Sequence, residues 1–78
     1  MGIYRSVPEH AEAVTPSDTL SLGATSTIYI GGAGNIKVVT TGGDTVTFNG
    51  VLAGIFLPVA VTQVFSTGTT ATNMVACF

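Results

Sequence analysis

The alternation of apolar and polar residues after about residue 24 predicts a series of short β-strands. Residues 45–48, for example, place Val46 and Phe48 on one face and two threonines on the other, as in a strand with one buried face. Segments rich in β-branched residues end at glycine-containing turns, and the sequence shows no helical period. The predicted strands are residues 25–30, 36–40, 45–48, 51–52, 55–65 and 73–78.

Three segments predict how these strands are connected. We interpret Gly31–Asn35 as a hairpin loop, because a dinucleotide-binding loop would need a third glycine where Lys37 stands. Asn49–Gly50 is a strong hairpin signal and predicts a type I′ turn. Residues 55–65 are apolar on both faces for part of their length, which predicts a central strand or a strand at a subunit interface, with a bulge or an edge at Pro58.

Composition divides the chain into two regions. Residues 1–24 hold four of the six charged residues, the only histidine and two of the three prolines, and they predict an extended N-terminal arm. Residues 25–78 predict a packed body that folds without the arm. The expected fold is therefore all-β, a small antiparallel β-sandwich or barrel of five to six strands with an extended N-terminal arm.

Low charge and small size indicate a protein that assembles with copies or partners. Charged residues make up 8% of the 78 residues, whereas an ordinary soluble domain has about 25%. Hydrophobic residues at 46% exclude a disordered segment, and two cations with a net charge of -2 exclude a protein that binds nucleic acid through its phosphates. A core this small, without a disulfide, gives marginal stability, so we expect the chain to form a homo-oligomer. The expected oligomer is a trimer. The strand over residues 55–65 or the last strand would lie at its interface.

Groups that could carry chemistry are scarce. His10 is the only imidazole and lies in the arm, so a hydrolytic triad lacks its base in the body. Cys77 stands between Ala76 and Phe78, without a cation that would stabilise a thiolate, so we predict a buried or interface thiol and not a nucleophile. We predict no catalytic residue, no cofactor and no metal site, and the protein is not expected to be an enzyme. The most apolar window, residues 50–61, has 12 residues where a spanning helix needs about 20, so no membrane partner is expected.

Five segments of the chain carry a resemblance to a known family. They are Ala13–Thr19 (AVTPSDT), Ile28–Ile36 (IYIGGAGNI), Thr45–Phe48 (TVTF), Gly54–Val59 (GIFLPV) and Ser66–Thr72 (STGTTAT). Over about residues 13–78 the chain resembles small proteins of tailed phages, prophages and gene transfer agents, described as head-spike base proteins or capsid-surface proteins. That family often has arginines near Ser26 and Gln63 and ends in Leu-Tyr, where this chain has Cys77 and Phe78. The resemblance implies a structural role in the virion and supplies no catalytic residue.

Resemblance and composition together predict a phage virion structural protein. The expected role is that of a capsid decoration or cement protein, which oligomerises and binds the major capsid protein on the outer capsid surface after assembly in the host bacterial cytoplasm. The alternative is the base of a vertex head spike or fibre, in contact with a spike or fibre protein. A third hypothesis is a glycan- or peptide-binding module that uses Tyr29 or Phe56 as a platform.

The residues expected at the partner or oligomer interface are apolar side chains of the arm and of the last strands. Such side chains are costly to leave in water, and an extended segment buries them when it docks on the sheet edge of a neighbour. They are Ile3, Tyr4, Val7, Pro8, Val14, Phe56, Pro58, Val64 and Phe78.

Overall fold

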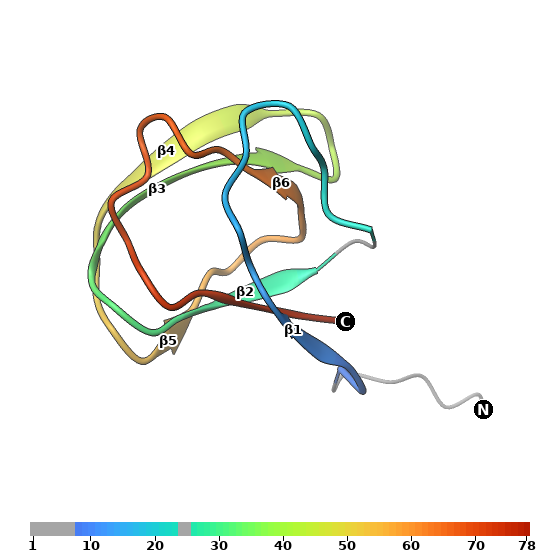
Figure 1. The fold of residues 1–78 in the computed structure, drawn as a ribbon, viewed down its shortest axis with the longest axis horizontal. Coiled ribbons are helices and arrows are strands. Elements are labelled where there is room, and N and C mark those ends of the chain that lie inside the picture. Colours follow the sequence, from blue (N-terminus) through green and yellow to red (C-terminus); the bar gives the residue numbers. More distant parts are fainter. Residues whose placement is uncertain (1–7, 24–25) are drawn as a thin grey trace.

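Two antiparallel β-sheets pack face to face in the computed structural model, which describes residues 8–23 and 26–78 (Figure 1). The strands are β1 (Ala11–Ala13), β2 (Thr27–Ile30), β3 (Gly34–Thr40), β4 (Thr45–Val51), β5 (Ile55–Phe56), β6 (Val61–Val64) and β7 (Val75–Cys77). The four-stranded sheet has the order β1-β7-β2-β5, and the three-stranded sheet has the order β4-β3-β6. The described residues contain no helix, so the predicted all-β antiparallel sandwich is confirmed.

The core lies between the two sheets and follows the two-residue period of the strands. In β2, the fully buried Ile28 and Ile30 alternate with the half-buried Thr27 and Tyr29. The buried apolar residues are Ile28, Ile30, Ile36, Val38, Leu57, Val61, Val64, Ala71, Met74 and Ala76. Val64 was predicted to face a partner, but it is only 2% exposed and belongs to this core, so it presents no surface for a partner.

Residues 8–23, the described part of the predicted arm, pack on the rest of the chain. Ala11–Ala13 form β1, which pairs with β7 at the end of the chain. Val14 packs against the core. Ser17 and Leu22 donate their N–H groups to carbonyl oxygens of β6, over 2.9 and 2.7 Å, and so cover the outer edge of that strand. These contacts indicate that residues 8–23 pack with the rest of the chain as one unit, whereas the sequence predicted a body that folds without the arm.

The predicted turn at Asn49–Gly50 is wrong, because both residues lie inside β4. The strand register leaves Asn35 of β3 opposite both of them, which is a β-bulge. Gly50 has a φ of 68° there and donates its N–H to Asn35 Oδ1 over 2.9 Å. The sequence signal for a positive φ at Gly50 was correct, but this conformation occurs in a bulge and not in a turn. The hairpin that does form joins β3 to β4 through residues 41–44, where Gly43 has a φ of 95°.

The segment Gly31–Asn35 does not form the predicted hairpin loop, because β2 and β3 belong to different sheets. Its glycines instead allow a close approach of the chain near Thr72. Gly32 donates its N–H to the Thr72 carbonyl over 2.7 Å and accepts the Thr72 N–H over 3.1 Å. A Cβ placed on Gly34 would lie 2.6 Å from the backbone nitrogen of Ala71. The absence of side chains at these positions lets two backbones pack directly together.

The predicted single strand over residues 55–65 is two strands in different sheets. β5 is an edge of the four-stranded sheet and β6 is an edge of the three-stranded sheet. The chain crosses between them around Pro58, which has no N–H to continue a ladder. Pro58 therefore lies between two strands and not at the predicted bulge or edge of one, and the predicted central strand is wrong. With β1 from the arm and this division, the described residues form seven strands in place of five to six.

Candidate interface on the outer face of the four-stranded sheet

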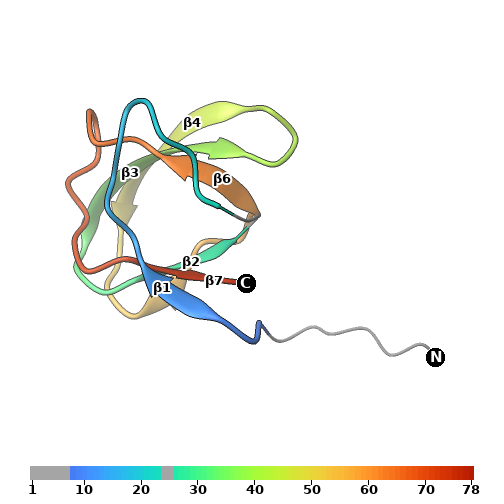
Figure 2. The same ribbon diagram turned by 45° about the vertical axis from the view of Figure 1, so that its right-hand side comes forward.

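The strands of the four-stranded sheet place no charged side chain on its outer face. Ile28 and Ala76 are register partners and point into the core, so the next residues along each strand, Tyr29 and Val75, point outward. Figure 2 shows this sheet in the lower part of the fold, with the three-stranded sheet above it. By the same register, the outward side chains are those of Ala11, Ala13, Thr27, Tyr29, Phe56, Val75 and Cys77.

The outer face of the three-stranded sheet is polar by comparison. Its outward side chains are those of Lys37, Val39, Thr45, Thr47 and Gln63. The Nζ of Lys37 lies 4.9 Å from the centroid of the Phe65 ring, a cation–π contact within the chain. A polar face is suited to water, whereas a contiguous apolar face on a small protein is typical of a contact surface. The difference between the two outer faces indicates the four-stranded sheet as the candidate interface.

Two aromatic rings form the most prominent apolar part of this face. Phe56 on the edge strand β5 is 55% exposed and is the register partner of Tyr29. The ring centroids lie 5.3 Å apart with an interplanar angle of 65°, an edge-to-face arrangement. This packing holds both rings in place, and exposed aromatic side chains of this kind often contribute much of the binding energy at protein interfaces.

A shallow hollow of about 300 Å³ connects the Phe56 ring to the N-terminal end of the described chain. Its walls come from Pro8, Glu9, His10, Ala11, Phe56 and Cys77. The fold thus brings together Pro8 and Phe56, two of the predicted interface residues. Phe78, a third, stacks its ring on that of His10 with centroids 5.5 Å apart, but it lines a different hollow.

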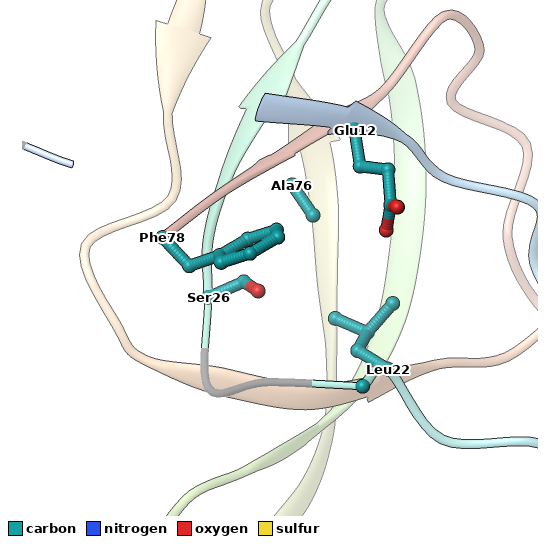
Figure 3. A pocket seen from close by; sticks show the side chains of 6 residues that line it. Glu12, Leu22, Ser26, Ala76 and Phe78 are labelled. Carbon is teal, nitrogen blue, oxygen red and sulfur yellow. The ribbon is translucent and has the colours of Figure 1, made fainter. Parts of the chain in front are cut away.

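A second hollow, of about 280 Å³, opens between the two sheets (Figure 3). It is lined by Glu12, Leu22, Gly23, Ser26, Ala76 and Phe78. Apart from Glu12, its side chains are uncharged. The hollow therefore presents one carboxylate in largely apolar surroundings.

Comparison with solved structures gives a match that extends over most of the chain. A chain from the capsid of a native GTA (gene transfer agent) particle, computed with C5 symmetry, superposes with a TM-score of 0.80 and 33% sequence identity. The match covers 91% of this chain and 83% of that chain. The chain belongs to the family of this GTA capsid chain. The resemblance to phage-like capsid proteins is thereby confirmed at that level. No protein-family model and no curated protein sequence matches the chain.

The predicted interface residues of this GTA capsid family member lie in different places. Val14 is half-buried against the core of its own chain, and Pro58 is exposed where the chain crosses between the sheets. Ile3, Tyr4 and Val7 lie outside the described residues.

Sequence reasoning missed the small outward side chains of β1 and β7. The sequence Ala11-Glu12-Ala13 does contain the alternation of a strand, but it is only three residues long and stands in a charged region. Cys77, predicted to be a buried or interface thiol and not a nucleophile, is half-buried on the outer face. Within residues 8–23 and 26–78, no group of three or more His, Cys, Asp or Glu side chains forms a metal-binding arrangement. In the same part of the chain, no helix has the length and apolar character to cross a membrane.

Asp18 ties the N-terminal segment to the turn at residues 66–67. Its Oδ1 accepts the N–H groups of Ser66 and Thr67 over 3.0 and 2.9 Å, and its Oδ2 accepts the Thr67 hydroxyl over 2.5 Å. These hydrogen bonds, first that of the Thr67 side chain and then that of its N–H, lower the pKa of Asp18 below its ordinary value of 3.8.

The Asp18 contacts predict an acid-sensitive contribution to stability. Because the folded-state pKa is lowered, this contribution is complete above pH 3.8 and is lost as the pH falls through the lower folded-state value. Asp18→Asn is expected to lower the unfolding temperature at pH 7 and to make unfolding less dependent on pH below about 4. Thermal unfolding followed by circular dichroism from pH 2 to 7 measures both effects. Asp44→Asn removes the same charge at the β3–β4 turn and serves as the control. If both variants show the same change in unfolding temperature and in its pH dependence, the acid-sensitive contribution cannot be assigned to Asp18.

Proposed function

We propose that this chain is a structural protein of a phage-like particle, attached to the outer surface of the capsid as a decoration protein. The observation that carries the proposal is the 33% identity over 91% of the chain with a component of a GTA capsid. The major capsid protein is the proposed partner, and the outer face of the four-stranded sheet is the proposed contact surface. The role is structural, and no catalytic step is assigned to any residue.

The chemistry of the outer face supports this mode of attachment. A surface with Phe56 and Tyr29 as aromatic anchors, whose strands carry no charged side chain, can bury apolar area against a second protein. Self-association of the chain, with a trimer as the expected size, is part of the same proposal, because a single copy leaves Leu20, Leu52 and Phe56 more than half exposed.

A second candidate is the base of a spike or fibre at a capsid vertex. The similar capsid was computed with C5 symmetry, which is compatible with a position at a fivefold vertex as well as elsewhere on the capsid. In this role, copies would surround a fivefold axis and contact a spike or fibre protein on their outer side.

Localisation of the chain in purified particles tests the proposal and separates the two candidates. We expect density for the chain on the outer surface in particle images, and no such density in particles from cells that lack its gene. Density spread over the capsid lattice supports a decoration protein, and density confined to the vertices supports the spike base. Particles that contain none of the chain, from cells that produce it in soluble form, would contradict both roles.

A further inference from the structure

Glu12 is a charged residue at an inward-facing position of an edge strand. Its register partner in β7 is Ala76, which is 3% exposed and belongs to the core. The Glu12 carboxylate accordingly points into the hollow between the sheets, toward Leu22 and on the same side as the Phe78 ring (Figure 3). Glu12 is an exposed residue, so its carboxylate is accessible to a cationic group from outside the chain.

The described residues supply no cation to this carboxylate. The cation in that part of the chain is Lys37, which belongs to the other sheet and lies over the Phe65 ring. A hollow with one carboxylate, an aliphatic wall from Leu22 and an aromatic wall from Phe78 matches the side chain of an arginine or a lysine. The aliphatic stem of such a residue packs on apolar walls while its charged head pairs with the carboxylate.

The backbone of β1 is open to the addition of another strand. His10 and Phe78 exchange N–H···O bonds over 2.6 and 2.8 Å, so His10 and, two residues later, Glu12 turn their backbone groups toward β7. Ala11 and Ala13 therefore turn their N–H and C=O groups away from the sheet, and β1 is its outermost strand. An added strand would bond to these two residues, and its side chain opposite Glu12 would enter the hollow.

We propose that residues 3–7 of a second copy of this chain add to β1 and place Arg5 against Glu12. In an extended segment, Ile3, Arg5 and Val7 share one face, and this order of apolar, cationic and apolar side chains complements the hollow. If each copy adds its residues 3–7 to β1 of the next copy, the chains are linked head to tail. Such an arrangement can close as a ring, for example the expected trimer. The inference rests on the self-association part of the proposed function and does not require attachment to the capsid.

A charge-exchange experiment tests this pairing. Arg5→Glu and Glu12→Arg are each expected to weaken self-association of the purified full chain by at least about tenfold in sedimentation equilibrium, and the double variant is expected to recover most of that loss. Glu12→Gln is a second variant that removes the charge of Glu12, and it keeps the shape of the side chain. Asp44→Arg makes the same charge change at the distant β3–β4 turn and is expected to leave association unchanged.

Each of the following results would overturn the proposal. The first is a wild-type chain that stays monomeric at micromolar concentration, or single variants that associate as it does. The second is a double variant no better than the single ones. The third is an effect of Glu12→Arg without an effect of Arg5→Glu, which would assign the Glu12 contact to a group of the second copy other than Arg5. Occupancy of the same variants on particles is measured separately, so a failure of strand addition is distinguishable from a failure of capsid attachment.

Discussion

A chain that begins at Thr19 is expected to lose cooperative folding, although it keeps six of the seven strands. The truncation removes β1 from the edge of the four-stranded sheet, so β7 loses its partner on that side. It also removes Val14 from contact with the core and Asp18 from its three hydrogen bonds to residues 66–67. A domain of this size has a stability of about 3–5 kcal/mol, and the combined loss of strand pairing and apolar burial is expected to consume most of it.

The matched control is a chain that begins at Pro8, which keeps every contact described above for residues 8–23. Its unfolding temperature in circular dichroism, at concentrations where both chains are monomeric, is expected to stay within about 3 °C of the full chain, a change of well under 1 kcal/mol for a domain of this size. The chain that begins at Thr19 is expected to show no sigmoidal transition or one at least about 15 °C lower. Cooperative unfolding of the Thr19 chain at the temperature of the full chain would show that the body folds alone, as its composition first indicated.

The strands predicted most accurately were those whose identity depends on local pattern. Residues 25–30, 36–40 and 45–48 overlap β2, β3 and β4, because β-branched residues and a two-residue period favour a pleated strand wherever it lies in a sheet. The errors arose where one local signal has two structural uses. Asn49–Gly50 can supply a positive φ to a bulge as readily as to a turn. Closely spaced glycines can form a loop, but they can also allow a second backbone to approach closely, as at Gly32.

The candidate interface was harder to predict, because residues far apart in the sequence form it. Ala11 is the partner of Cys77 across the β1–β7 pair, and neither the composition nor the spacing of the arm indicates that contact. Phe56 was identified as an interface residue from its apolar surroundings, while its neighbour Tyr29 was considered only as a binding platform. The apolar residues of the 55–65 segment belong partly to the surface and partly to the core, since the chain changes sheet at Pro58.

Substitution of Phe56 by lysine is expected to abolish most of the binding to the capsid. The side chain is 55% exposed, and its contact with Tyr29 is worth about 0.5–1.5 kcal/mol, so Phe56→Lys is expected to fold with only a modest loss of stability. In the bound state, by contrast, the new ammonium group would be buried on a face whose strands carry no charged side chain. Removal of an aromatic anchor and burial of an unpaired charge each cost on the order of 2 kcal/mol or more at interfaces. The expected loss of affinity is therefore at least about thirtyfold.

The most direct test of the proposed attachment compares the two outer faces. Phe56→Lys places a positive charge on the four-stranded sheet, and Thr45→Lys places the same charge at an exposed position on the outer face of the three-stranded sheet. Each variant is incubated with particles that lack the chain, and the amount bound is measured after the particles are sedimented. We predict that Thr45→Lys binds within about twofold of the wild-type chain and that Phe56→Lys binds at least about thirtyfold more weakly. Equal binding by the two variants, or a loss confined to Thr45→Lys, would contradict attachment through the four-stranded sheet.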